Sequence, residues 1–275
     1  MSDELLHHAP GPALAGVAVR CSGYSHRAEG PVRFHELPGA FIPLILDLDQ
    51  GWDIALGRAP DARLERFGTF LAGLTEGPVI VQHPGTARCL QIDLTPPGAR
   101  RLLGVPMHEL ANRCVGLEDV LGAPARELIE RLADAPGWPE RFAIAERVIA
   151  DRLDAAPPPP GEVAWALGRI EASGGNVPIG GLARELGWSH RRLVAAFRDQ
   201  VGLPPKRVAR IVRFERVQRA VAAAPGEGWA RVAAACGFAD QAHLAREVGE
   251  LAGVTPTALR AEAVNSVQDR VAVAA

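Results

Sequence analysis

Short apolar or alternating runs, separated by glycine and proline, make up the chain to about residue 95. The runs are four to nine residues long, and no helical period persists through them. Runs of this length between turn residues are typical of β-strands. The runs that we expect to form strands are 17–20, 32–37, 41–48, 52–56, 63–71, 79–82 and 89–94. The pattern therefore predicts a small β-barrel or sandwich.

Beyond Thr95 the apolar positions begin to recur at helical spacing. Two of the expected helices are long enough to carry an apolar stripe, which includes Leu128 and Leu132 in the first of them. Such stripes either cap the barrel or form a seam between two copies of the chain, and the sequence leaves both open. The expected helices are 99–103, 107–113, 124–133 and 139–153.

Four consecutive prolines form the clearest boundary in the chain. A proline run cannot continue a helix and favours a stiff, extended spacer. Only helical patterns follow it, at 162–173, 179–186, 189–201, 205–224, 229–236, 240–252 and 256–263. We therefore predict an α+β protein with a β-rich domain and helical extension (1–154), a linker (155–161), an all-helical domain (162–263) and a flexible tail (264–275).

Two segments of the all-helical domain have the pattern of a helix-turn-helix unit. In 179–201 a short helix ends at Gly187, which supplies a tight turn, and Ser189 then caps the next helix. The same pattern returns with Gly237 and Asp240, and the two caps are 51 residues apart. The domain therefore holds a duplicated unit, and the second helix of each unit has a polar outer face.

The formal net charge of −2 by itself argues against a nucleic-acid ligand. The average hides a split, because residues 178–220 hold ten basic residues and only three acidic ones. A polyanion such as DNA is therefore expected to contact this part of the chain.

The four cysteines are far apart, and none is near a histidine at the spacing of a zinc site. We interpret them as reduced thiols of a cytoplasmic protein, because the first residues are too polar for a signal peptide. No run approaches 18 uninterrupted apolar residues, so we expect no membrane span. The histidines lack the His-x-His pattern of metal-dependent barrels, and no Gly-x-Ser-x-Gly elbow occurs. We expect no metal, no cofactor and no enzyme activity.

Two series of residues at regular spacing run through the all-helical domain. The first consists of Leu182, Ala183, Arg184, Glu185, Leu186, Gly187, Ser189, Leu193, Phe197, Arg198, Gly202, Pro205, Arg210, Arg213 and Phe214. The second consists of Val232, Ala233, Cys236, Gly237, Phe238, Asp240, Gln241, His243, Arg246, Gly253, Thr255, Pro256 and Arg260. In order and spacing, over about 179–260, they resemble the DNA-binding domain of the AraC/XylS family of transcription regulators. The resemblance implies that both units bind double-stranded DNA.

The resemblance also implies that the second helix of each unit enters the major groove. The residues that we expect to contact bases are Arg191, Gln241, His243 and Arg246. Those that we expect to contact phosphates are Ser189, His190, Arg192, Arg198, Lys206, Arg207 and Arg210. Val194 and Ala195 stand where relatives contact bases, so we expect the first unit to recognise fewer bases than the second.

The front domain of this family is often a small, cupin-like barrel that binds an effector or forms a dimer. The resemblance therefore implies control by a small molecule or through a homodimer, and RNA polymerase as a partner if the chain is an activator. The residues that we expect to line a ligand pocket are Tyr24, His35, Phe41, Trp52, Phe67 and Phe70.

Two alternatives keep the same DNA-binding tail. In one, the front domain is a protein-interaction module without a pocket. In the other it is an enzyme, which the residue patterns disfavour. With the resemblance, we expect a bacterial, cytoplasmic, nucleoid-associated regulator.

Overall fold

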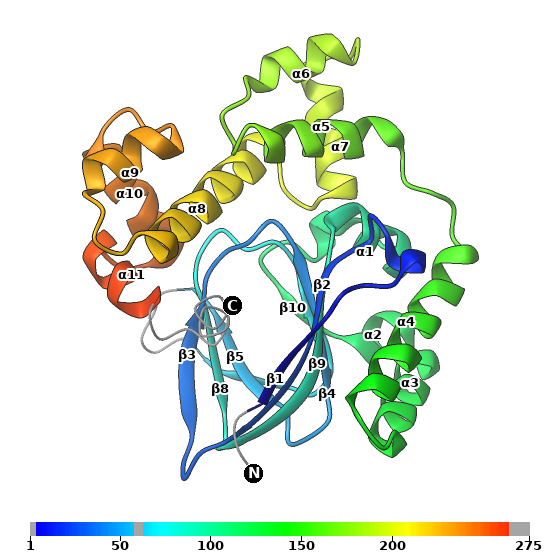
Figure 1. Ribbon diagram of the computed structural model, residues 1–275. Helices are drawn as coiled ribbons and strands as arrows, with labels where there is room; N and C mark the ends of the chain where they lie inside the picture. Colours follow the sequence, from blue (N-terminus) through cyan, green and yellow to red (C-terminus); the bar gives the residue numbers. More distant parts are fainter. Residues whose placement is uncertain (1–3, 58–62, 264–275) are drawn as a thin grey trace.

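The computed structural model describes residues 4–57 and 63–263. Within these ranges the strands come first and the long helices follow (Figure 1). The predicted α+β class, with a β-rich part before an all-helical part, is confirmed. The predicted tail, 264–275, lies outside the described residues.

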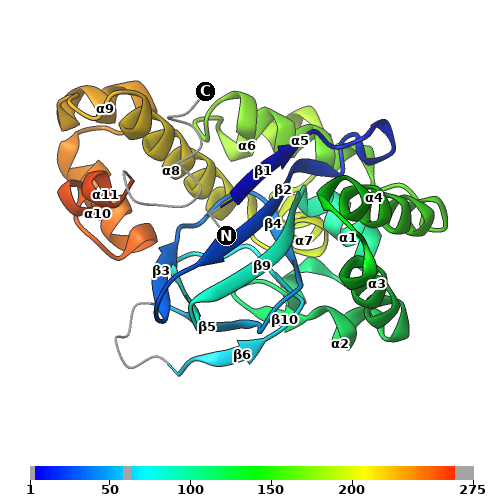
Figure 2. The ribbon, with the colours of Figure 1, turned by 60° about the horizontal axis from the view of Figure 1, so that its bottom comes forward.

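Two antiparallel sheets form the β-rich part (Figure 2). Both contribute to the wall of one cavity. The larger sheet has the order β1-β2-β9-β4-β7-β10. Its strands are β1 (Glu4–His8), β2 (Ala18–Arg27), β9 (Thr86–Leu94), β4 (Ile42–Asp47), β7 (Phe70–Ala72) and β10 (Cys114–Gly116). The smaller sheet has the order β3-β8-β5-β6. Its strands are β3 (Val32–Glu36), β8 (Val79–His83), β5 (Trp52–Leu56) and β6 (Glu65–Phe67).

Strand β4 of the larger sheet is covered on both faces, which explains why 41–48 is almost continuously apolar. Along β4, Ile42, Leu44 and Leu46 are buried in the main core. Pro43 and Ile45 point the other way and line the cavity. Side chains alternate between the faces of a strand, so a strand with both faces covered needs apolar residues throughout.

Helices after β9 cover the outside of the larger sheet (Figure 1). They are α1 (Pro96–Leu103), α2 (Leu117–Leu121), α3 (Ala123–Asp134) and α4 (Trp138–Asp154). The apolar stripes of α3 and α4 belong to the main core, where Leu132 is 0% and Phe142 is 4% exposed. The stripes therefore cap the barrel within one chain, which is one of the two possibilities that the sequence left open.

The proline run connects α4 to the helices of the C-terminal part. These are α5 (Gly161–Ala172), α6 (Ile179–Glu185), α7 (His190–Gln200), α8 (Pro205–Ala223), α9 (Trp229–Cys236), α10 (Gln241–Ala252) and α11 (Pro256–Ala263). The main core continues across the linker, because Leu193 and Phe197 of α7 belong to the same buried cluster as Leu90 of β9. The second unit has a separate core that includes Phe214 and Leu244.

Several local predictions were wrong. The single strand expected at 63–71 is instead β6 and β7, which lie in different sheets, and β10 and α2 were not predicted. Strand β1 was not predicted; its residues pair with β2 so that His8 lies opposite Cys21. In place of the helix expected at 107–113, only a 3₁₀ turn, Met107–Glu109, forms, and Asn112 has a left-handed φ of 54°. Among the described helices, none is both long and apolar enough to cross a membrane.

Candidate functional site

The first helix-turn-helix unit consists of α6 and α7. Gly187 between them has a φ of 66°, in the left-handed region that favours glycine. The hydroxyl of Ser189 accepts a hydrogen bond from the backbone N–H of Arg192 at 3.2 Å, so Ser189 is the N-cap that the sequence predicts. The inner face of α7 is buried in the main core, which leaves Arg191 exposed on the outer face.

The second unit consists of α9 and α10 and repeats this geometry. Gly237 ends α9 with a φ of 79°. The Oδ1 atom of Asp240 accepts a hydrogen bond from the backbone N–H of His243 at 2.6 Å, so Asp240 caps α10. Leu244 and Val248 are fully buried in the core of this unit, and the opposite face of α10 is exposed.

Three of the four predicted base-contacting side chains are exposed on the outer faces of these helices. They are Arg191 on α7, and Gln241 and Arg246 on α10. His243 is half-buried, and its ring packs edge-on against Phe238 with the ring centroids 5.3 Å apart. Its Nδ1 also accepts a hydrogen bond from the backbone N–H four residues earlier, at 3.5 Å. This arrangement makes His243 a support for the start of α10.

The predicted phosphate-contacting residues differ in their surroundings. His190, Arg198 and Lys206 are exposed. Arg192 is exposed as well, and its guanidinium lies 4.3 Å from the centre of the Trp188 ring. That stacking restrains the side chain near the start of α7, where a phosphate group would approach.

Arg210 is engaged in ion pairs within the protein. Its Nε donates to the carboxylate of Glu247 at 2.9 Å, and its Nη2 contacts Glu250. Burial lowers the pKa of Arg210, but the two carboxylates outweigh burial and the net shift is upward. Arg210 therefore stabilises the contact between α8 and α10. Arg207 is also paired, with its Nη1 3.2 Å from Oε1 of Glu76 on the barrel.

The helix α8 joins the two units and sets their separation (Figure 1). It has 19 residues, which span about 28 Å at 1.5 Å per residue. Successive major-groove windows on one side of DNA are about 34 Å apart. The geometry of α8 therefore suits two units that contact adjacent windows.

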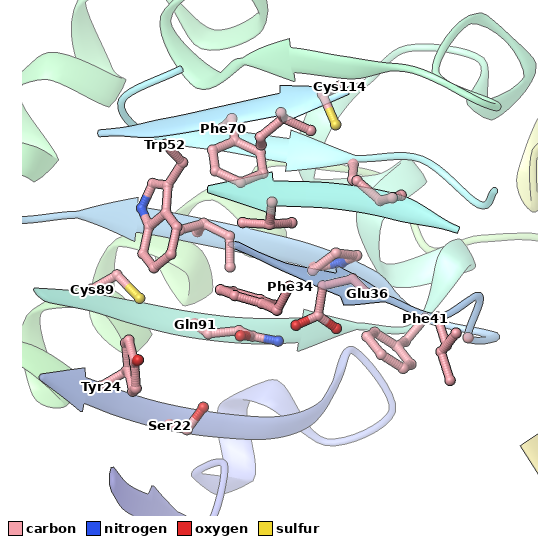
Figure 3. A pocket seen from close by; sticks show the side chains of 18 of the residues that line it. Ser22, Tyr24, Phe34, Glu36, Phe41, Trp52, Phe70, Cys89, Gln91 and Cys114 are labelled. Atoms are coloured by element: carbon pink, nitrogen blue, oxygen red, sulfur yellow. The ribbon is translucent and has the colours of Figure 1, made fainter. Parts of the chain in front are cut away.

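A cavity of about 140 Å³ lies between the two sheets (Figure 3). Figure 3 shows Trp52, Phe70 and Tyr24 toward one end of the cavity and Phe41 at the other. These four residues are among the six that the sequence suggested, and all of them line the wall.

The other two suggested residues do not line this cavity. His35 is exposed, because side chains alternate along β3 and the inward positions belong to Phe34 and Glu36. Phe67 is half-buried and packs against Phe70 with ring centroids 5.7 Å apart. The expectation for His35 and Phe67 as cavity residues was therefore wrong.

One connected polar group interrupts the apolar wall. The Nη2 atom of Arg20 lies 2.6 Å from Oδ2 of Asp93, and its Nε donates to the same oxygen at 2.8 Å. Gln91 donates from Nε2 to Oδ1 of Asp93 at 2.8 Å. Asp93 is 2% exposed; Arg20 supplies the opposite charge at one carboxylate oxygen, and Gln91 donates a hydrogen bond to the other.

The loop between β3 and β4 joins the cavity to α8. Its cavity-lining residues are Leu37, Gly39 and Phe41. The residues between them face α8: the backbone N–H of Ala40 donates to Oε1 of Glu215 at 2.7 Å, and the carbonyl of Pro38 accepts from Nε2 of Gln218 at 3.3 Å. One short segment therefore contacts both the cavity and the helix that carries the second unit.

Two further observations strengthen this link. Leu37 packs against the core of the second unit, although it belongs to the barrel. Burial raises the pKa of the Glu215 carboxyl, against the lowering effects of the Ala40 N–H and of Arg219. The loop therefore contributes both apolar and polar contacts to the C-terminal part.

Several cavity residues were not predicted from the sequence, among them Arg20, Ser22, Phe34, Glu36 and Gln91. The available signal was alternation, since Phe34 and Glu36 are two residues apart in an expected strand. Alternation fixes which residues share a face but not which face is inside, and that depends on strand pairing.

The described cysteines are free thiols whose pKa values are raised by burial. Burial raises the pKa of Cys21 and of Cys114 to about 12. Thiols that stay protonated are poor nucleophiles and poor metal ligands. In 4–57 and 63–263, no group of three or more His, Cys, Asp or Glu residues has the geometry to hold a metal ion.

The sequence-profile comparison concerns the C-terminal part. Residues 182–262 match the sequence profile of a helix-turn-helix domain family. No curated protein matches the chain in sequence.

Among solved structures, ToxT from Vibrio cholerae in its P21 crystal form is 9% identical to the chain, with a TM-score of 0.48 over 87% of this chain and 97% of ToxT. ToxT from Vibrio cholerae strain SCE256 with a bound unsaturated fatty acid is 9% identical, with a TM-score of 0.46 over 92% and 96%. The AraC-like transcriptional activator CuxR is 16% identical, with a TM-score of 0.28 over 79% and 86%.

The profile match covers both capped units, the helix α8 between them and most of α11. Two units in one domain, each with a glycine turn and a side-chain cap, are the arrangement that the two series of residues predict. Residues 182–262 are therefore a helix-turn-helix domain that holds two such units.

Proposed function

We propose that the chain regulates transcription by binding DNA through both units, under the control of a small molecule in the barrel cavity. The β3–β4 loop carries this proposal. Its residues alternate between the cavity wall and α8, so a ligand that contacts Gly39 or Phe41 also acts on the hydrogen bonds to Glu215 and Gln218. Differential contacts of this kind are what a ligand needs to shift a protein between two states.

The structure also supports this proposal against its alternatives. An interaction module without a pocket leaves the cavity unexplained. The apolar stripes of α3 and α4, the alternative dimer seam, are buried in the core. Buried, protonated thiols speak against a cysteine nucleophile in a fused enzyme.

The proposal includes further partners. A homodimer suits operators with two half-sites. RNA polymerase is the partner of an activator, and the bacterial cytoplasm, next to the nucleoid, is where such a regulator acts.

Substitution of Gly39 by alanine tests the coupling. A Cβ at Gly39 lies 2.3 Å from the Phe41 ring, so the ring or the loop has to move. We expect Gly39→Ala to change the affinity of the full chain for DNA several-fold, as measured by fluorescence anisotropy on a sequence selected from a random pool. Gly30→Ala is the matched control, since a Cβ at Gly30 has no atom within 4 Å. Unchanged affinity for Gly39→Ala, with the fold intact by circular dichroism, contradicts the proposed coupling.

A further inference from the structure

We propose that the β3–β4 loop sets the position of the second helix-turn-helix unit relative to the barrel, whereas the first unit is fixed to the barrel. This inference rests on the proposed function, because it makes the second unit the one that an effector regulates. It follows from the packing of the two units: the first shares the core of the barrel, and the second has a core of its own.

The first unit is packed directly on the barrel. Val201 at the end of α7 is 0% exposed and belongs to the main core, as does Met107 of the 3₁₀ turn. A Cβ at Gly202 would lie 3.0 Å from the carbonyl oxygen of Met107, so the two backbones are in close contact. The guanidinium of Arg100 on α1 lies 3.6 Å from the carboxylate of Asp199 on α7. Separation of the first unit would expose apolar surface to water, so we expect the barrel and α7 to move as one body.

The second unit is packed on the second half of α8 instead. The buried apolar residues of α8 from Val208 to Val212 belong to the main core, and those from Phe214 onward belong to the second core. Figure 1 shows α9, α10 and α11 around the far end of α8, apart from α6 and α7. Beside α8, the Nδ2 atom of Asn176 donates to the carbonyl of Cys236 at 3.4 Å, and so long a hydrogen bond restrains the second unit only weakly.

The β3–β4 loop contacts this second half of α8. Its two hydrogen bonds go to Glu215 and Gln218, and Leu37 packs against the second core. Leu37 and Phe41 also line the cavity. Among the described residues that line the cavity, none lies on α1, on α7 or in the 3₁₀ turn that holds α7. A ligand that displaces the loop therefore acts on the second unit first.

Another route from the cavity leads to the first half of α8. Thr75 lines the cavity, and the next residue, Glu76, lies 3.2 Å from Arg207. The side chains of Arg207 and Glu76 are 51% and 30% exposed, so this ion pair contributes little. The first half of α8 is also buried in the main core, which holds it in place whether or not the pair forms.

Pulsed electron–electron distance measurements between two nitroxide labels on the full chain follow each unit separately. The labels are placed by Glu127→Cys on α3, Ala195→Cys on α7 and Ala235→Cys on α9, all at exposed positions. The described native thiols have raised pKa values, so they react slowly with the label. The α3–α7 pair reports on the first unit, and the α3–α9 pair reports on the second.

Leu37→Ala removes the apolar contact between the loop and the second core. We expect this variant to shift or broaden the α3–α9 distances and to leave the α3–α7 distances as in the wild type. Gln218→Ala removes the hydrogen bond to Pro38 and should act in the same direction, which keeps the test decisive if Leu37→Ala does not fold. Leu6→Ala is the matched control, because it truncates a leucine of β1 that is 36% exposed, and it should change neither distance.

Two results overturn the inference. The first is a change of the α3–α7 distances as large as that of the α3–α9 distances, or no change in either pair. The second is a shift of the α3–α9 distances in Glu76→Gln as large as in Leu37→Ala, because the barrel would then act on the second unit through Arg207 and the first half of α8.

DNA titrations separate this inference from the proposed function. The half-site of the second unit is the one at which Arg246→Ala relaxes specificity. If Leu37→Ala changes the affinity for DNA that retains this half-site and leaves the affinity for DNA with this half-site scrambled unchanged, both proposals are supported. If the affinity changes equally on both DNAs, control by the barrel stands and its assignment to the second unit fails. If the distances change as expected but neither affinity does, the position of the second unit depends on the loop and control of DNA binding fails.

Discussion

Replacement of Arg210 by methionine distinguishes a structural role from a phosphate contact. Arg210 on α8 contacts Glu247 and Glu250 on α10, and the side chains of Arg210 and Glu247 are each 17% exposed. Methionine keeps the length and the apolar stem of arginine, but it leaves two neighbouring carboxylates without their cation. The repulsion between the two carboxylates destabilises the contact between α10 of the second unit and α8.

The expected loss in the free energy of unfolding is about 2–3 kcal/mol. An exposed ion pair contributes at most about 1 kcal/mol, and removal of one partner from a buried pair costs about 3–5 kcal/mol. The Arg210–Glu247 pair lies between these limits, since both side chains retain some exposure. Each kcal/mol shifts the Tm of a chain of this size by about 2–4 °C, so a shift of about 4–12 °C follows.

The assay combines unfolding with DNA binding at several salt concentrations. Urea unfolding followed by circular dichroism measures the loss in stability. The slope of the logarithm of DNA affinity against the logarithm of salt concentration counts phosphate contacts, at about 0.9 per contact. We expect this slope to be unchanged in Arg210→Met. Lys206→Met is the matched control, because Lys206 is exposed at the start of α8. It should reduce the slope by about 0.9 and leave stability unchanged. The reasoning is refuted if Arg210→Met reduces the slope as Lys206→Met does and unfolds like the wild type.

Three further predictions concern the DNA contacts and the buried titratable groups. Arg191→Ala and Arg246→Ala should each weaken DNA binding by about 1–3 kcal/mol and relax specificity at different half-sites in a selection from random DNA. If both variants lose specificity at the same base positions, the two units do not contact adjacent major-groove windows. Burial raises the pKa of the Glu215 carboxyl, so the folded protein binds the carboxyl proton more tightly than the unfolded chain does. The stability that this group contributes is fully present below the ordinary carboxyl pKa and is lost as pH rises through the raised value. Glu215→Gln keeps an acceptor for the Ala40 N–H and should flatten the loss of stability with rising pH, measured by urea unfolding at a series of pH values. An unaltered pH dependence in this variant contradicts the role of Glu215. Burial lowers the pKa of the fully buried His83 from 6.5, so wild-type stability should be lost as pH falls below about 6.5, and the loss should be smaller in His83→Gln. Equal acid sensitivity of the two proteins disproves this assignment.

The elements that could be predicted from the sequence are those with a signal in their own residues. Ser189 and Asp240 are good helix caps wherever they occur before a helix, and both cap the expected helices. The residues of β1 carry no such local signal, because the strand forms only by contact with segments that are distant in the sequence. It pairs with β2, and the ring of His8 stacks on Phe142 of α4 with ring centroids 4.5 Å apart.

In the candidate sites, too, the roles of single side chains depend on partners that are distant in the sequence. An arginine in a basic segment fits both a phosphate contact and an ion pair, and the partner of Arg210 lies 37 positions away in the sequence. On β3, a shift of one residue separates the exposed His35 from Phe34 on the cavity wall. Aromatic content was enough to suggest Trp52 and Phe70, whereas the polar group around Asp93 exists only once β2 and β9 are paired.

The β3–β4 loop also limits how strongly a cavity ligand can act on DNA binding. Its polar contacts with α8 are the two hydrogen bonds from Ala40 to Glu215 and from Gln218 to Pro38. Each contributes about 0.5–1.5 kcal/mol, so breaking both changes the balance between two states by about 1–3 kcal/mol, which corresponds to about 5–150-fold in affinity. Complete switching from 1:99 to 99:1 requires about 5.5 kcal/mol. A ligand that acts through this loop therefore produces a graded change in DNA affinity. An effect larger than about 150-fold would require movement of Leu37 out of the core of the second unit as well, and hydrogen exchange of α8 with and without ligand would reveal it.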